Sequence, residues 1–170
     1  MLPINMTATT RRLTLSALFT AIAVLLPILF HGIGLGAVFL PMFWPVAASV
    51  FFLPLSFACC IAVLAPFVSM LLTGMPPVPI IYIVLAQLFI LALVTGYCRK
   101  KAQWGVFWPL LCGVIASQIA HFIAIIPLAN ILGLPSWLAA FPLLLKGVPG
   151  LALILIIVPA ALSRIKHRSV

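Results

Sequence analysis

The sequence predicts an all-α membrane protein, a bundle of six transmembrane helices with both termini on the cytoplasmic side. Hydrophobic residues make up 66% of the 170 positions and charged residues 5%, whereas about a quarter of the residues of a soluble domain are charged. Mean hydropathy is +1.44. Because one span takes roughly 20 residues, a chain of this length has room for about six helices with short connections and for no separate soluble domain.

The basic residues predict the orientation. All nine lysine and arginine residues lie at the edges of apolar runs, and the sequence contains no aspartate or glutamate. We interpret the clusters as topology signals held at anionic lipid headgroups, and not as a nucleic-acid-binding surface. With the amino terminus inside, six spans leave only Lys146 outside. Five spans would put the basic carboxy-terminal cluster outside, so the even number is favoured.

Three segments make up the predicted organisation: a cytoplasmic segment at residues 1–12, a single membrane domain at 13–164 and a basic cytoplasmic tail at 165–170. The first predicted helix runs from Leu13 to about Phe30. The residues after it, beginning at His31, are a poor cleavage site for a signal peptidase, so we expect this helix to remain in the protein.

The later spans are predicted from the apolar runs between helix breaks. They cover about residues 36–53, 56–72, 78–97 and 105–127, and the last one begins near Lys146 and ends in the carboxy-terminal basic cluster. A longer connection is expected at residues 128–146. Within it, residues 137–145 form either the outer part of the last helix or a short re-entrant piece.

The stretch from Pro41 to Pro77 contains the least regular part of the predicted bundle. Pro54 marks a tight reversal between the second and third spans, so both ends of this hairpin reach the same membrane face. Pro41 and Pro45 interrupt the first turns of the second span, and irregular backbone at that depth is tolerated only where it lines a protein cavity. An outward-facing binding site is therefore predicted from the connections at residues 31–38, 73–79 and 128–146.

A strip of small residues lies on the first predicted helix. Ala17 and Ala21 form a small-x-x-x-small pair, with Ser16 and Thr20 beside them. Such a strip lets another helix approach closely. It serves either packing within the bundle or docking of a separate subunit.

The composition excludes several kinds of chemistry. Without carboxylates the chain has no acid/base carboxylate pair, no Ser-His-Asp triad and no carboxylate site for calcium or magnesium. The four cysteines have no metal-ligand spacing and are interpreted as packing residues. The sequence also lacks the G-x-x-x-x-G-K-[ST] nucleotide loop. These absences exclude much hydrolytic chemistry, and we predict neither a metal nor a cofactor; that the chain is not an enzyme is what the family resemblance described below implies.

Polar and aromatic side chains near the outer face are candidates for ligand binding. His31 either hydrogen-bonds a ligand or lies among the headgroups. Trp44 either stacks on a planar ring or belongs to the aromatic belt. Lys146 either pairs with an anionic group of the ligand or snorkels to the headgroups. Because no carboxylate can balance a cationic ligand, neutral or anionic ligands are favoured.

Two amides lie near the middle of predicted spans, where an unsatisfied amide is costly. Gln87 and Gln118 either bond each other or form a polar floor to the site. His121 follows Gln118 by one turn on about the same face and extends this polar stripe. Asn130 either caps a helix end or hydrogen-bonds the ligand. The remaining candidate contacts are Met42, Thr73, Met75 and Tyr82.

Four runs, in this order, resemble the substrate-binding S-component of energy-coupling factor transporters, a small vitamin-uptake module of six helices. The runs are Ala17-x-x-x-Ala21, Phe39-Leu40-Pro41-Met42 with Pro45-Val46, Pro66-x-x-Ser69 through Thr73-Gly74-Met75-Pro76-Pro77, and Lys146-Gly147-Val148-Pro149-Gly150. Together they cover nearly the full chain. Two positions depart from the family pattern, because Phe43 stands where relatives carry histidine and Gln87 where they often carry an acidic residue.

The resemblance implies a multi-pass protein of a prokaryotic plasma membrane that captures a vitamin or vitamin precursor outside the cell. Delivery then requires a membrane coupling subunit and two cytoplasmic ATPases, and toppling of the S-component in the bilayer carries the ligand inward. The strip of Ala17 and Ala21 is the candidate contact with the coupling subunit. Two alternatives stay open: an integral-membrane enzyme acting on lipid or isoprenoid, with His31 or His121 as base, and a pore-forming or purely assembling helix bundle.

Overall fold

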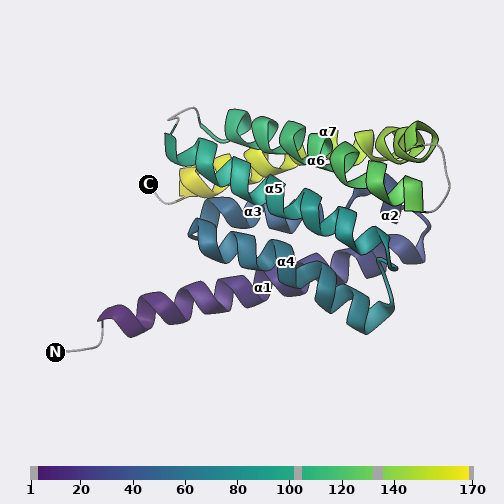
Figure 1. Cartoon of the computed structure of the whole chain (residues 1–170). Helices are drawn as coiled ribbons and strands as arrows, with labels where there is room; N and C mark the ends of the chain where they lie inside the picture. Colours follow the sequence, from purple (N-terminus) through teal and green to yellow (C-terminus); the bar gives the residue numbers. More distant parts are fainter. Residues whose placement is uncertain (1–3, 102–104, 132–135, 169–170) are drawn as a thin grey trace.

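The fold was analysed in a computed structural model that describes residues 4–101, 105–131 and 136–168, with side chains undescribed at 4–7, 37, 128–131, 136–144 and 165–168. The described chain is an all-helical bundle (Figure 1). Its helices are α1 (Ile4–Gly32), α2 (Gly36–Phe39), α3 (Phe43–Phe52), α4 (Leu55–Thr73), α5 (Ile80–Lys101), α6 (Phe107–Ile131) and α7 (Ser136–Arg168).

Five of the described helices, α1, α4, α5, α6 and α7, are each long and apolar enough to cross a membrane. α1 begins and α7 ends at the same end of the bundle, and α3 turns into α4 there as well (Figure 1). We name this the termini end. The end of α4 and the start of α5 lie at the opposite end, as do the end of α6 and the start of α7. The multi-pass membrane bundle predicted from composition is thus confirmed.

The single helix predicted over residues 36–53 is divided. Leu40 adopts the left-handed conformation, with φ 46° and ψ 53°, and its N–H bonds the Gly36 carbonyl, so α2 ends there. This confirms the irregular start expected from Pro41 and Pro45. Because α3 has ten residues, it is about 15 Å long and is too short to cross a hydrocarbon core of about 30 Å. The short helices α2 and α3 thus occupy the place of the second predicted span.

Three helices, α1, α6 and α7, extend well beyond their predicted ends. The long connection expected at residues 128–146 is wrong, since α6 continues to Ile131 and α7 already begins at Ser136. Residues 137–145 are the outer part of the last helix, the first of the two alternatives. At the other end of the chain, α1 begins at Ile4 and not near Leu13. In a membrane the backbone must bond within its own segment, so α6 and α7 continue through residues that would end them in water.

The core forms around α3, which packs against α1, α4, α5 and α7. Val46 and Val50 of α3 are buried in one cluster with Leu88 and Leu91 of α5. Burial of such side chains stabilises the bundle mainly through close packing, because lipid is as apolar as they are. The central position of a short helix explains how α3 is held although it does not cross the membrane alone.

Arg99 connects the end of α5 to the end of α3. Pro54 has no N–H, so the Val50 carbonyl four residues earlier lacks its helical partner. The Arg99 guanidinium donates to this carbonyl and lies 5.5 Å from the centre of the Phe51 ring. A cation at a helix carboxyl end is also favoured by the helix dipole. Arg99 thus satisfies a carbonyl that the turn at Pro54 leaves open.

Replacing Arg99 with methionine is expected to lower the free energy of unfolding by about 1.5 kcal/mol, the lower end of the range for a hydrogen bond with a charged partner, because Arg99 is partly exposed. Lys100→Met removes the same charge from an exposed neighbour and is the matched control. Thermal unfolding in detergent measures both. Equal losses in the two variants would assign the effect to net charge and contradict the role of the Val50 contact.

Candidate ligand-binding site

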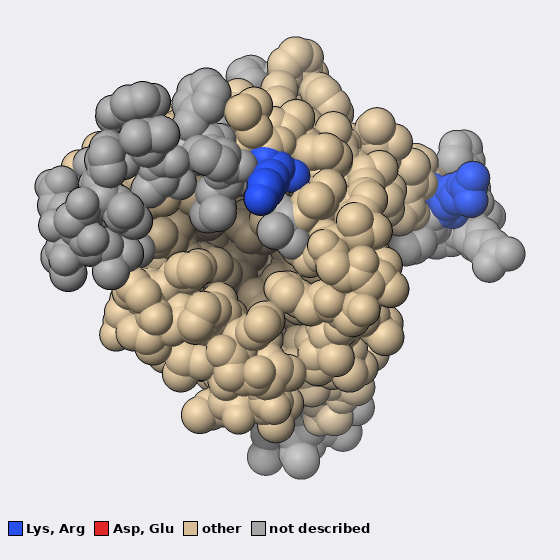
Figure 2. Space-filling view, turned by 90° about the vertical axis from the view of Figure 1, so that its right-hand side faces the viewer, with Lys and Arg blue, Asp and Glu red and all other residues tan. Residues whose placement is uncertain are grey.

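Four helices form a closed ring. α3 packs against α5, α5 against α6, α6 against α7 and α7 against α3, whereas neither diagonal pair packs comparably among the described residues. The interior of such a ring is a common location for ligand sites in helical bundles. Seen from the end opposite the termini, the surface is hollowed and carries a blue basic side chain at the rim of the hollow (Figure 2).

Gly113 of α6 allows α6 to lie close to Leu91 and Thr95 of α5, and this contact defines the register of the two helices. A Cβ atom at Gly113 would overlap Thr95 Oγ1 and lie 3.0 Å from the Leu91 carbonyl oxygen. Further along, Ile83 and Ile125 are buried in one small cluster. Both contacts belong to the same antiparallel register. Thr95 was not predicted as part of this contact. Its spacing from Gly113, on the two sides of the connection between α5 and α6, could have indicated that the two residues meet.

A buried polar layer lies on this seam. Gln87 of α5 is 8% exposed and His121 of α6 is 3% exposed, and the register set by Gly113 places them opposite one another. Ser117, one turn before His121, is also buried, and its hydroxyl donates to the Val114 carbonyl at 2.8 Å. Ser117 was not predicted as part of the polar stripe, although it precedes Gln118 directly and lies one turn from His121.

Gln118 supplies a polar atom that the protein does not satisfy. Its Nε2 is enclosed and has no hydrogen-bond partner, so the predicted bond between Gln87 and Gln118 is not made through this nitrogen. An unsatisfied buried donor costs about 1–3 kcal/mol. Such a donor beside His121 and Ser117 is suited to a ligand acceptor.

Trp44 lies on the side of α3 that faces α1. Its ring meets Phe30 of α1 edge-on, with 5.9 Å between the ring centroids. Two turns later on α3, Phe52 packs against Phe19, which also belongs to α1. Trp44 Nε1 is enclosed without a hydrogen-bond partner. The Trp44 ring is partly buried against Phe30 and the main core cluster, while its N–H remains available as a second donor.

Lys146 is exposed and lies on α7 just before two glycines that contact α2. A Cβ atom at Gly150 would lie 2.5 Å from the carbonyl carbon and oxygen of Phe39, and one at Gly147 would lie 3.0 Å from Leu40 Cδ1. The backbones of α7 and α2 therefore approach closely. This contact fixes the backbone of α7 beside Lys146.

Two predicted residues at the end opposite the termini bond to their own segments. His31 Nδ1 lies 2.7 Å from the Pro27 carbonyl oxygen and so carries the proton in the neutral ring, which leaves Nε2 as an acceptor. Thr73 donates its hydroxyl to the Ser69 carbonyl at 2.8 Å and accepts from the Met75 N–H at 3.2 Å. Both side chains are exposed, and neither reaches the polar layer through these bonds.

The remaining candidates are dispersed. Met42 is buried in the core, whereas Met75 and Tyr82 are 49% and 63% exposed. The side chain of Asn130 lies outside the described residues. The structure therefore places Gln87 and His121 opposite one another on the α5–α6 seam, with Gln118 one turn before His121 on α6, while Met42 lies in the core and Met75 and Tyr82 lie on the surface.

Comparisons of the chain with known protein families, with curated proteins and with solved structures gave no match.

Proposed function

We propose that this chain is the substrate-capture subunit, an S-component, of an energy-coupling factor type importer in a prokaryotic plasma membrane. It binds a neutral or anionic vitamin-like molecule outside the cell and passes it inward with a membrane coupling subunit and two cytoplasmic ATPases. The observation that carries the proposal is the polar layer on the α5–α6 seam, where Gln87 and His121 are buried and the Gln118 Nε2 is enclosed without a partner, in a molecule that is hollowed at the end opposite its termini.

The polar groups favour a ligand that accepts hydrogen bonds. Gln118 Nε2 and Trp44 Nε1 are enclosed N–H donors without partners, and Lys146 adds a cation on α7. The sequence offers no carboxylate to a donor-rich or cationic ligand. A flat molecule with carbonyl or carboxylate oxygens matches this set of donors.

The charges support an orientation in which the termini end faces the cytoplasm. Arg11, Arg12 and Arg164 lie near the ends of the chain, and Arg99–Lys101 close α5 at the same end of the bundle. Basic residues are enriched on the cytoplasmic side of membrane proteins. In this orientation the hollow opens outward and receives the ligand there.

The exposed strip on α1 supports a separate partner. Ala17 and Ala21 are both exposed, whereas Ala23, on the face toward the core, is fully buried. Packing within the bundle thus uses another face of α1. Since the sequence has no nucleotide loop, the partner that docks here would supply the energy.

Co-purification tests the proposal directly. A tagged chain, extracted from native membranes under mild conditions, is expected to bring down a membrane subunit and an ATPase together with one bound small molecule. A bound small molecule without any ATPase, across repeated extractions, would contradict the importer and leave a binding protein. Chemical conversion of the bound molecule by the chain alone would favour the membrane enzyme.

Gln118→Leu separates a binding role from a structural role. We expect ligand affinity to fall about tenfold or more, because a hydrogen bond of about 1–3 kcal/mol is lost. Thermal stability without ligand should stay equal or rise, because an unpartnered donor is removed. Tyr82→Leu, on the exposed face of α5, is the control and should change neither quantity. Lower stability with unchanged affinity would contradict the proposed contact.

A further inference from the structure

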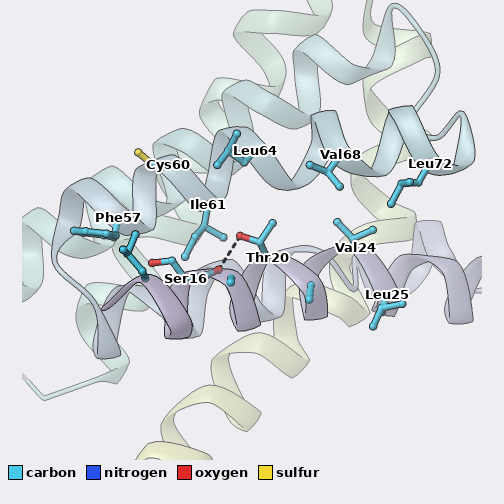
Figure 3. Close-up of a pocket in the computed structure, with 13 residues that line it drawn as sticks. Ser16, Thr20, Val24, Leu25, Phe57, Cys60, Ile61, Leu64, Val68 and Leu72 are labelled. Atoms are coloured by element: carbon cyan, nitrogen blue, oxygen red, sulfur yellow. Dashed lines mark hydrogen bonds between the residues drawn. The ribbon is translucent and has the colours of Figure 1, made fainter. Parts of the chain in front are cut away.

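A groove runs between α1 and α4, away from the polar layer. Its volume is about 790 Å³, and the side chains that line it converge from the two helices (Figure 3). Ala17, Ala21 and Leu25 contribute from α1, and Cys60, Leu64 and Leu72 contribute from α4. All six are exposed. The groove therefore opens at the surface of two helices that are long and apolar enough to cross a membrane.

The groove offers no free hydroxyl group to a polar ligand. Its two hydroxyls are already used, because Ser16 donates to the Arg12 carbonyl and Thr20 donates to the Ser16 carbonyl, each at 2.8 Å. The second of these bonds is drawn in Figure 3. Apart from the Cys60 thiol, the other lining side chains are hydrocarbon. An apolar chain fits this surface, whereas a polar ligand would lose its hydration without gaining partners.

The length of the groove matches one leaflet of a bilayer. Its lining on α1 extends from Leu13 to Leu25, which is about 18 Å at 1.5 Å per residue. Half of a hydrocarbon core of about 30 Å is about 15 Å. An acyl chain that enters at the membrane surface would thus lie along the whole groove.

Basic side chains lie where the headgroup of such a lipid would be. Arg12 is one helical turn before Ser16, on the face of α1 that forms the groove, and Arg11 is its neighbour. Both are exposed. Because the sequence contains no aspartate or glutamate, no side chain of this protein can form an ion pair with them. An apolar groove that begins beside two unpaired cations at a membrane interface has the chemistry of an anionic phospholipid site.

We propose that the α1–α4 groove binds one acyl chain of an anionic phospholipid whose phosphate is held by Arg12 and Arg11. The site depends on no residue of the polar layer, but it shares Ala17 and Ala21 with the proposed docking strip. A coupling subunit that docks on Ala17 and Ala21 would displace this lipid. Lipid then covers the strip in the free subunit, and the coupling subunit replaces this lipid when the complex assembles.

Native mass spectrometry of the purified full chain tests the site, with phosphatidylglycerol and phosphatidylcholine of the same acyl length as probes. One phosphatidylglycerol is expected to be retained per chain, about fivefold or more above phosphatidylcholine, since each basic residue near the surface contributes about 1 kcal/mol. Arg12→Gln should lower phosphatidylglycerol retention about fivefold and leave phosphatidylcholine unchanged. Arg164→Gln, an exposed arginine at the other end of the chain, should change neither.

Filling the groove tests the acyl-chain part. Ala21→Phe should abolish retention of both lipids, whereas Ala160→Phe, at an exposed alanine of α7 outside the groove, should not. Equal retention of both lipids by the wild type, or equal effects of Arg12→Gln and Arg164→Gln, would overturn the headgroup assignment. Equal retention by Ala21→Phe and Ala160→Phe would overturn the groove. If the spectra showed a dimer of the chain in place of bound lipid, and Ala21→Phe abolished that dimer, the groove would be a dimer contact and the proposal would be overturned.

Discussion

Uptake of the ligand into cells is expected to fall to background when Ala17 and Ala21 are both replaced by phenylalanine, while ligand binding by the purified chain stays at the wild-type level. The two alanines are exposed on α1 and line the groove with α4, so bulky rings block the close approach of a partner helix. The polar layer lies on α5 and α6 and is not touched by these changes. Uptake of labelled ligand and equilibrium binding measure the two effects.

The matched control for this double variant places phenylalanine at Ala152 and Ala160, two exposed alanines of α7. It should keep normal uptake. Arg12→Gln separates docking from lipid binding, because it weakens the proposed lipid site and leaves the alanine strip intact; its uptake should remain normal. Undiminished uptake in the Ala17 and Ala21 variant would remove the docking surface from the proposal, and lost ligand binding would show that the strip is structural.

Gly150→Ala is expected to destabilise the protein by about 1–3 kcal/mol, the cost of overpacking a close contact, and to weaken ligand binding with it. The added Cβ would lie 2.5 Å from the Phe39 carbonyl group and 2.8 Å from the Val38 carbonyl oxygen. Backbone atoms cannot move aside as a side chain does, so α2 must shift away from α7. Thermal unfolding and ligand binding in detergent measure the result.

Two other glycines complete a graded series. At Gly147 the nearest atom is Leu40 Cδ1 at 3.0 Å, the end of a flexible side chain, so alanine should cost less there than at Gly150. At Gly32 a Cβ meets nothing within 4 Å, so alanine should be neutral. A loss at Gly32 as large as that at Gly150 would show that the contact between α7 and α2 does not hold this part of the bundle.

The sequence predicted best those helices whose ends carry strong local signals. The span expected at residues 56–72 is Leu55–Thr73 in the structure. Pro54 precedes its first residue, and Gly74 follows its last with φ 70°, a conformation that glycine adopts at little cost. These signals act within one turn, so no knowledge of the rest of the fold was needed.

Proline was a poor guide inside the membrane. Pro142 falls in the connection expected at residues 128–146, yet it lies within the continuous helix α7, as the alternative of an outer helical part at 137–145 allowed. Proline removes one hydrogen bond, but leaving the helix in lipid would expose several backbone groups. Conversely, the end of α2 depends on the left-handed conformation of Leu40, a residue type with no preference for it. Pro41 and Pro45 indicated the break, but not the left-handed conformation of Leu40, which lies in a segment that contacts α7 closely at Gly150.

The candidate site was predictable only in part. The spacing of Gln118 and His121 correctly put them on one helix face, because one turn is a local property. That Gln87 lies opposite them depends on the register of α5 and α6, which the glycine at position 113 permits through contact with Thr95 and Leu91. Tyr82 was expected near the ligand and is largely exposed, since a nearly uniformly apolar helix carries little information about which face is buried.

The central claim, a small molecule held by the polar layer, is tested most directly by identifying what leaves the protein. Wild-type and Gln118→Leu protein are extracted from native membranes and denatured, and the released small molecules are measured by mass spectrometry. The prediction is one compound with carbonyl or carboxylate oxygens in stoichiometric amount from the wild type, and about tenfold less or lower from the variant. No compound other than lipid from the wild type, or equal amounts from both proteins, would contradict the claim.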